Sequence, residues 1–242
     1  MSGEAVALSS VLLDLKRWAR QRQRAGRKHV HFEAMSVDAA PAVLPKRAGA
    51  PSIDAAAALA ILERERVVGC TRCKLHGSRK NTVFGVGNPM ASLLVVGEAP
   101  GRDEDSQGEP FVGAAGQLLN KILAAIGFAR EEVYIANILK CRPPNNRDPE
   151  PEEVAACLPN LLEQLEIIRP KIILALGRVA AQNLLETSAP LGRLRNKVHA
   201  YRDIPLMVTY HPAALLRNAQ YKRPTWDDVQ KLRELHDKLV RG

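Results

Sequence analysis

The chain has 242 residues, a formal net charge of +9 at pH 7, 46% hydrophobic residues and four cysteines. This length and this hydrophobic content fit one main globular domain with a substantial core, and they exclude a disordered chain. No window approaches the roughly 18 apolar residues of a membrane-spanning helix, and the N-terminus lacks the apolar segment of a secretory signal. We therefore expect a cytoplasmic or nucleoid-associated protein without a membrane partner.

The positive charge lies at the two ends of the chain. Lysine and arginine outnumber aspartate and glutamate by 9 to 4 in residues 1–50 and by 11 to 5 in residues 190–242, whereas residues 51–189 hold 15 basic and 17 acidic residues. Basic ends are typical of a protein that binds a polyanion, most often nucleic acid, although scattered lysine and arginine on any globular protein give a similar total.

Residues 1–50 are predicted to form a basic extension ahead of the main domain, residues 51–242. Apolar residues repeat at helical spacing from Leu8 to Ala19, Ser9 or Ser10 is a suitable N-cap, and Gly26 is a stop signal. The Pro- and Ala-rich residues 39–52 that follow are typical of a linker. The helix is either a strut docked on the core or a basic arm that contacts a DNA backbone.

From residue 52 onward, helical patterns alternate with short apolar runs. Helices are predicted over residues 52–70, 115–127, 150–170, 177–186 and 226–240. Buried strands are predicted over residues 92–97, 133–139, 171–177 and 204–210. Strands that alternate with helices indicate a three-layer α/β/α fold with a central, mostly parallel four-stranded sheet.

Polar residues follow the predicted strands. Glu98 comes directly after the first strand, Asn137 lies late in the second, Gly177 ends the third and His211 follows the fourth. In open parallel sheets, ligands bind beyond the carboxyl ends of the strands, where loops and helix N-termini converge. We therefore expect a carboxylate, an amide and an imidazole to meet at one edge of the sheet.

One loop runs against the basic trend of the chain. Residues 97–113, GEAPGRDEDSQGEPFVG, hold five carboxylates and four glycines. Glycines let main-chain N–H groups approach a ligand, and a carboxylate can orient water. Glu98 is the leading candidate for that role, followed by Glu104 and Asp105. The alternative is that residues 103–105 form a solvated turn or cap the next helix.

The four cysteines form two pairs. Cys70 and Cys73 are spaced C-x2-C, and Cys141 and Cys157 are separated by fifteen residues. A cytoplasmic setting disfavours disulfides, so a four-thiolate metal site is the best interpretation, and the spacing alone fits either zinc or an iron–sulfur cluster. A structural role is favoured over electron transfer, because the cysteines would cross-link distant elements and the chain shows no partner cofactor motif.

Several separated motifs, together with the cysteine pairs, resemble those of the iron–sulfur (family 4) uracil-DNA glycosylases. The motifs are GEAPGRDEDSQGEPFVGAAGQLL, NILKCRPPNNRDPEPEE, LALG with the helix that follows it, and HPAALLR. The resemblance covers about residues 58–240 and leaves residues 1–50 outside. It implies hydrolysis of the N-glycosidic bond of deoxyuridine in single- or double-stranded DNA by a monomer, at the start of base excision repair. It also implies a [4Fe–4S] cluster on Cys70, Cys73, Cys141 and Cys157.

The resemblance also implies roles for the residues beyond the strands. Glu98 lies in the uracil-binding loop, Phe111 stacks on the extruded base, Asn137 reads its edge and His211 faces its O2. Ala99, Glu104 and Asp105 belong with Phe111 among the residues that bind the substrate. The sequence lacks the GQDPYH-type aspartate of other uracil glycosylases, so the resemblance does not assign the group that positions water.

The HPAALLR segment resembles the loop that enters the minor groove in this superfamily, with Leu215 or Leu216 as the wedge and Arg217 beside it. Phosphate contacts are expected from the basic C-terminal third of the chain. The candidates are Arg217, Lys222, Arg223, Arg193, Arg195 and Lys197.

The chemistry agrees with these residue types. An asparagine can offer its carbonyl to uracil N3–H and its amide to O4, and cytosine presents the opposite pattern at both atoms. A histidine that donates to the developing charge on O2 is electrostatic catalysis worth about 2–4 kcal/mol. Each residue also has a structural alternative: Phe111 as core packing, Asn137 as a satisfied core amide and His211 as a structural histidine. Lys140 as a Schiff-base nucleophile is disfavoured because it adjoins Cys141.

Two other functions remain open on the sequence alone. One is a non-catalytic DNA-binding or polymerase-associated module of the same fold. The other is a phosphoesterase that holds Mg²⁺ with Glu98, Asp103 and Asp105.

Overall fold

The computed structural model describes residues 54–241. The predicted extension, residues 1–50, lies outside these residues, so the domain boundary near residue 50 stays a prediction. Within the described part of the chain, no helix is long and apolar enough to cross a membrane.

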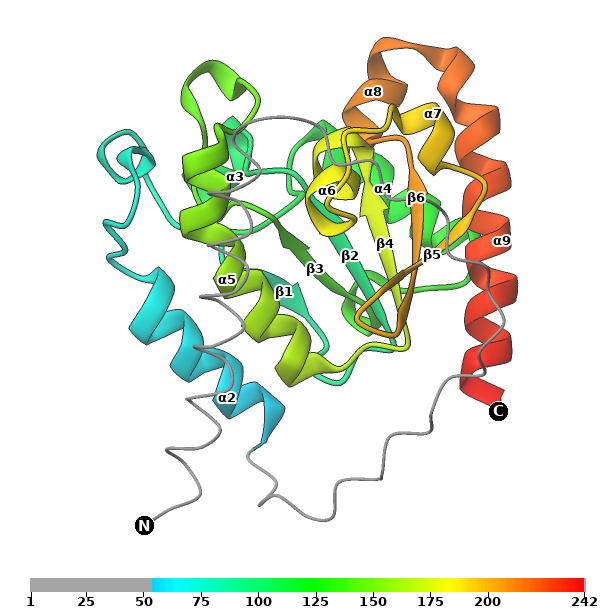
Figure 1. The fold of residues 1–242 in the computed structure, drawn as a ribbon, viewed down its shortest axis with the longest axis horizontal. Helices are drawn as coiled ribbons and strands as arrows, with labels where there is room; N and C mark the ends of the chain where they lie inside the picture. Colours follow the sequence, from blue (N-terminus) through cyan, green and yellow to red (C-terminus); the bar gives the residue numbers. More distant parts are fainter. Residues whose placement is uncertain (1–53, 242) are drawn as a thin grey trace. The chain divides into compact units, whose positions relative to one another are not determined.

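Six strands form one sheet in the order β1-β3-β2-β4-β6-β5 (Figure 1). The four central strands are the predicted ones, and neighbouring strands among them pair in parallel. They are β2 (Leu93–Gly97), β3 (Tyr134–Asn137), β4 (Ile172–Leu176) and β6 (Ile204–Thr209). The predicted α/β class and mostly parallel sheet are confirmed. The predicted number of four strands is wrong, because an antiparallel strand is added at each edge.

The two edge strands lack the long apolar runs that identify the central four. β1 (Val86–Gly87) has only two residues, and β5 (Val198–Tyr201) alternates between exposed and half-buried positions. β5 pairs with β6 through a two-residue turn in which Arg202 and Asp203 have φ of 46° and 69°. These left-handed conformations belong to a tight hairpin turn that usually carries Asn-Gly, so Arg-Asp gave no turn signal in the sequence.

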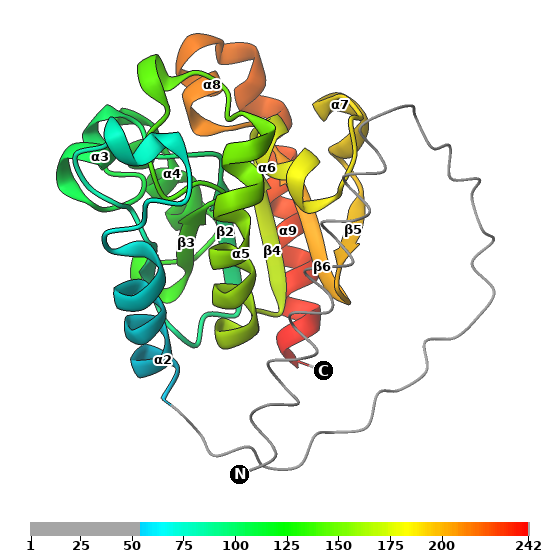
Figure 2. The same ribbon diagram turned by 60° about the vertical axis from the view of Figure 1, so that its left-hand side comes forward.

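Helices cover both faces of the sheet, as Figures 1 and 2 show. On one face, Leu119 of α4 (Ala114–Ala125) and Leu232 of α9 (Lys222–Arg241) pack with Val95 and Leu174 in the main buried cluster. On the other face lie α5 (Pro151–Ile168) and α6 (Gly177–Leu184). α2 (Ala55–Leu62) packs on α5 and continues as a π-helical turn, Glu63–Val67.

Helix α9 begins at Lys222, four residues before the start predicted at Trp226. Pro224 reads as a helix breaker in the sequence, but it lies in the first turn, where its missing N–H group costs no hydrogen bond. Short helical segments fill the loops between the longer elements. They are η2 (Lys74–Gly77), α3 (Arg102–Gln107), η3 (Arg130–Glu132), η4 (Pro144–Asn146), α7 (Leu191–Leu194), α8 (Pro212–Arg217) and η5 (Ala219–Tyr221).

Candidate functional site

The residues predicted to meet at one edge of the sheet all lie at the carboxyl ends of the parallel strands. Glu98 follows β2, Asn137 is the last residue of β3, Gly177 follows β4 as the first residue of α6, and His211 caps the N-terminus of α8 two residues after β6. The parallel register pairs Gly97 directly with Asn137. The topology therefore brings these residues to one edge, while their chemical roles remain predictions.

Asn137 and Phe111 converge over Gly97. A Cβ atom on Gly97 would lie 2.3 Å from Asn137 Oδ1 and 2.6 Å from Phe111 Cζ, so any other residue there would displace one of these two side chains. Asn137 is 2% exposed, and its Oδ1 has no hydrogen-bond partner within residues 54–241. A buried amide oxygen without a partner is costly in a folded protein and needs an explanation.

Phe111 is held in a strained backbone conformation, with φ of 55°. Its carbonyl group packs so closely on α4 that a Cβ atom on Gly116 would lie 1.8 Å from Phe111 O. The loop is fixed by Glu104, whose carboxylate accepts hydrogen bonds from the N–H groups of Gly101, Val112 and Gly113 at 3.0–3.1 Å. The Glu104 carboxylate therefore shapes the loop that presents Phe111.

The other residues of the acidic loop have different environments. Asp105 is 2% exposed and accepts from the N–H groups of Lys80 at 2.9 Å and Asn81 at 3.4 Å, which ties the loop to the segment after the C-x2-C pair. Ala99 is half-buried, next to Glu98. In the described chain, no three or more His, Cys, Asp or Glu residues form a group that could hold a metal ion.

His211 lies beside Phe111, with ring centroids 5.5 Å apart and ring planes inclined at 32°. The N–H group of Ala213 donates to His211 Nδ1 at 3.2 Å, which leaves the ring proton on Nε2. Burial, with a smaller contribution from the positive charge of Arg217, lowers the pKa of His211 to about 4. His211 is therefore neutral at pH 7 and has one N–H group, on Nε2, to donate.

Glu98 is the ionisable group of this edge whose pKa is closest to neutrality. Burial, with a smaller contribution from the negative charge of Asp148, raises the pKa of Glu98 to about 7, and the positive charge of Arg178 opposes both effects. Arg178, at the start of α6, forms an ion pair with Asp148. A carboxylate with a pKa near the working pH is suited to accept a proton during a reaction.

All four cysteines line a single cavity, where the two distant pairs come together. Cys141 and Cys157 are buried, and Cys70 and Cys73 are half-buried. Three of the sulfur atoms accept hydrogen bonds: Cys70 from Arg72 Nε at 3.3 Å, Cys141 from Arg79 Nη1 at 3.1 Å, and Cys157 from the N–H group of Lys140 at 3.1 Å. Such donors stabilise thiolates. The cysteine sulfurs are nevertheless not grouped closely enough within residues 54–241 to share one ion.

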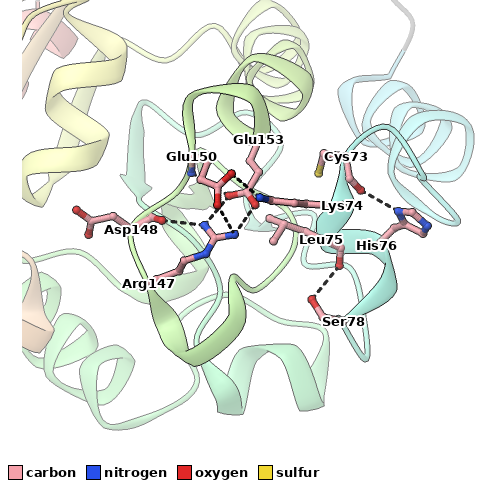
Figure 3. Close-up of polar contacts among 9 residues, drawn as sticks. All are labelled: Cys73, Lys74, Leu75, His76, Ser78, Arg147, Asp148, Glu150 and Glu153. Carbon is pink, nitrogen blue, oxygen red and sulfur yellow. Dashed lines mark hydrogen bonds and ion pairs between the residues drawn. The ribbon is translucent and has the colours of Figure 1, made fainter.

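Ion pairs connect the residue that follows Cys73 to α5, the helix that carries Cys157 (Figure 3). Lys74 reaches Glu150, the N-cap of α5. Arg147 binds the buried carboxylate of Glu153 with both terminal nitrogens, at 2.6 Å and 2.9 Å, and Glu150 at 3.3 Å. The network also fixes the loop before α5, which carries Asp148 close to Glu98.

The HPAALLR segment forms α8, and its two leucines differ. Leu215 is 3% exposed and belongs to the core, whereas Leu216 is 53% exposed and can contact a partner. Arg217 is exposed. Arg195, expected to contact phosphate, is instead buried against Asp228 at 2.7 Å and stacks on Tyr210, so it cannot bind a phosphate without breaking this pair.

Sequence reasoning missed the residues that support the site through hydrogen bonds. Arg130 donates to Glu109, Asn120 and the carbonyl of Pro110 beside Phe111. Arg72, between the two cysteines of C-x2-C, was visible in the sequence as a possible sulfur donor. Arg130 carried no signal, because it comes from another element and its partners are identified only by the fold.

Comparisons with known proteins agree with the site. Residues 84–230 match the model of a family described as the uracil DNA glycosylase superfamily. The chain is 50% identical over 177 residues to a type-4 uracil-DNA glycosylase of Archaeoglobus fulgidus, covering 70% of this chain and 89% of that protein. It is 47% identical over 161 residues to a protein of the same name from Pyrobaculum aerophilum, covering 63% and 82%. The corresponding protein of Thermotoga maritima is 45% identical over 171 residues, covering 69% and 89%.

Proposed function

The chain belongs to the uracil-DNA glycosylase superfamily, and from that premise we propose that it is a monofunctional uracil-DNA glycosylase. It extrudes deoxyuridine from DNA, hydrolyses the N-glycosidic bond and releases uracil, which starts base excision repair. It acts as a monomer in the cytoplasm, where it associates with the nucleoid. The observation that carries the proposal is the buried, unpartnered Oδ1 of Asn137 beside the ring of Phe111.

Base recognition follows from that amide. Uracil N3–H donates to Asn137 Oδ1 and O4 accepts from the Asn137 amide, whereas cytosine has an acceptor at N3 and a donor at C4. A site that holds an unpaired buried polar group rejects a ligand that cannot pair with it, because the group stays unsatisfied. The ring of Phe111 supplies a stacking surface for the base, which offsets part of the cost of unstacking it from DNA.

Bond cleavage requires stabilisation of two charges. The C1′–N1 electron pair leaves with uracil, whose O2 becomes negative, and the neutral His211 donates to it from Nε2. The sugar becomes cationic, and the carboxylate of Glu98 stabilises it and accepts the proton of the water that attacks C1′. The pKa of Glu98, about 7, leaves a large ionised fraction at neutral pH. Lys140 is 1% exposed, its Nζ donates to Asn137 and Gln164, and it plays no nucleophilic part.

Cys70, Cys73, Cys141 and Cys157 hold a [4Fe–4S] cluster whose chemistry is structural. Support comes from their shared cavity and from the nitrogen donors that point at three of their sulfurs. A [4Fe–4S] cluster would be held by all four thiolates and would not require them to surround a single ion. We expect Cys141→Ala to lose iron and soluble protein, while the rate per folded molecule falls less. Retention of full iron content would contradict this assignment.

DNA is bound by the exposed groups around α8. Leu216 enters the gap left by the extruded nucleotide, and Arg217, Lys222 and Arg223 contact phosphates. These basic side chains are all exposed.

The direct test is the release of free uracil from single- and double-stranded oligonucleotides that carry one uracil, with a chelator present and with alkaline cleavage of the abasic product. Chelator-resistant release of uracil is expected. Complete inactivity on a U·G duplex would overturn the proposal and favour a non-catalytic DNA-binding module.

A further inference from the structure

Lys140 is a fully buried lysine for which the glycosylase chemistry has no use. Its side chain is 1% exposed, and it lies between the base-reading residue, Asn137, and the cysteine Cys141. Its Nζ donates to the backbone carbonyl of Asn137 at 3.0 Å and to Gln164 Oε1 at 2.6 Å. No carboxylate within residues 54–241 lies within ion-pair distance of Nζ.

A buried ammonium group without a carboxylate is expensive to maintain. Taking a charge out of water costs several kcal/mol, and two neutral oxygen acceptors recover only part of it. An apolar side chain of the same size, such as methionine, would avoid this cost. Core packing alone therefore does not explain a lysine at position 140. The hydrogen-bond partners of its Nζ indicate its role.

The carbonyl that Lys140 holds has no strand partner. The N–H group of Ile138 donates to Gly97 on β2, and the carbonyl of Asn137 belongs to the same trans peptide unit, so it points the opposite way, to the β1 side. β1 pairs only with Tyr134 and Ile135, and ends before it reaches Asn137. Lys140 Nζ takes the place of the missing strand.

The acceptor on the other side of Nζ is itself fixed. Gln164 is 0% exposed, and its Nε2 donates to the carbonyl of Phe84 at 3.1 Å and to the hydroxyl of Tyr134 at 3.3 Å. This leaves its Oε1 directed at Lys140. The ammonium group is therefore held between a rigid amide of α5 and the end of β3.

The main chain of Lys140 lies against the cysteine cavity. Its N–H group donates to Cys157 Sγ at 3.1 Å, and its carbonyl accepts from the N–H group of Val83 at 2.8 Å. One residue thus contacts the cavity wall with its backbone and the base-reading residue with its side chain.

Resting on the proposed function, we propose that Lys140 is a positioning residue that fixes the backbone of Asn137, and so the direction of its amide, through the Nζ to Asn137 carbonyl hydrogen bond. It makes uracil recognition depend on the order of the cysteine cavity. Without it, the end of β3 relaxes, and the amide spends less time in the orientation that accepts uracil N3–H.

The test is Lys140→Met, which keeps the size of the side chain and removes the donor. The single-turnover rate of uracil release per folded molecule should fall about ten- to hundredfold, the size expected for one hydrogen bond from a charged donor. Inhibition by free uracil should weaken in parallel. The dissociation constant for an abasic-site duplex and the visible absorbance of the cluster per chain should stay within about twofold of the wild type.

Two further variants serve as controls. Lys140→Gln keeps a neutral N–H donor, and it should recover part of the lost rate and remain informative if the methionine variant does not fold. Lys171→Met makes the same chemical change at an exposed position at the opposite end of the sheet, before β4, and should leave every readout unchanged.

An unchanged rate and unchanged uracil inhibition in both Lys140 variants would overturn the inference. So would a loss of rate that is matched by equal losses of DNA affinity or cluster absorbance, because this pattern indicates general collapse. Failure of the wild-type protein to release uracil would contradict the proposed function instead, and the two failures are therefore distinguishable.

Discussion

Two groups of residues that serve the same proposed reaction are held in opposite ways. In the inner group, Phe111 and Asn137 are buried, at 5% and 2% exposed, and His211 is half-buried. The outer group, Leu216, Arg217, Lys222 and Arg223, projects from the surface, with Leu216 53% exposed. Buried polar groups gain strength and specificity from exclusion of water, whereas exposed charges contribute little apiece and are screened by salt. The inner group should therefore decide which base is removed, and the outer group how tightly DNA is held.

Among substitutions near the inner group, Glu98→Gln should have one of the largest effects. It should lower the excision rate about 10²- to 10⁴-fold without loss of DNA binding. Because the ionised carboxylate acts, the wild-type rate should rise as pH rises through about 7. Single-turnover rates measured against pH check this expectation. A pH-independent wild-type rate across neutrality would exclude Glu98 as the base.

The same substitution should stabilise the fold above neutral pH. Burial raises the pKa of Glu98 from 4.5 to about 7 in the folded protein. As pH rises, this carboxyl group therefore ionises at a lower pH in the unfolded chain than in the folded one. The wild-type free energy of unfolding falls as pH rises from 4.5 through 7. Glu98→Gln removes this loss, and its Tm should exceed that of the wild type at pH 8 and equal it below about pH 4.5. A lower Tm at pH 8 would mean that the carboxylate is stabilised in the fold.

His211→Ala should lower the excision rate about 10²- to 10³-fold, the range expected for loss of one preorganised donor. The affinity for an abasic-site duplex should change little, because His211 belongs to the inner group. Rates and affinities measured on the same preparation separate the two effects. A variant that loses affinity and rate equally would place His211 with the DNA-binding residues.

The two leucines of α8 offer a matched pair across the boundary between the groups. Leu216→Ala should lower excision from duplex DNA about tenfold and leave single-stranded DNA almost unaffected, because only a duplex leaves a gap to fill. Leu215→Ala should instead cost about 2–5 kcal/mol of unfolding free energy, as for other buried leucines. Duplex-to-single-strand rate ratios and thermal melts tell them apart. Equal behaviour of the two variants would contradict the assignment of the wedge.

The smallest effects should come from single charges of the outer group. Lys222→Gln should weaken DNA binding at low salt and reduce the slope of log affinity against log salt by about 0.9, without changing which base is excised. Binding measured at several salt concentrations gives the slope. A change in base preference would show that the two groups are not separate.

Asn137 and His211 could be identified because they lie at the ends of continuous apolar runs, whereas Phe111 was identified through the family motif that contains it. Runs such as residues 171–177 mark strands buried on both faces, and a parallel sheet brings their ends together. The edge strands were not predicted, because β1 is only two residues long and the turn after β5 consists of Arg202 and Asp203, without glycine. The supporting contacts could not be predicted from the sequence either. The role of Glu104 depends on the backbone N–H groups that the fold places beside it, and the role of Arg195 depends on the carboxylate of Asp228. Spacing along the chain does not encode such pairings.

The central claim is that the buried amide of Asn137 reads uracil, and Asn137→Ala tests it most directly. Single-turnover uracil release and affinity for an abasic-site duplex should be measured with matched wild-type and variant preparations that contain equal amounts of cluster. Our account predicts a loss of at least about a thousandfold in rate, because N3–H and O4 of the bound uracil would lose their hydrogen-bond partners in a buried site, with affinity nearly unchanged. Excision by Asn137→Ala at close to the wild-type rate would contradict it.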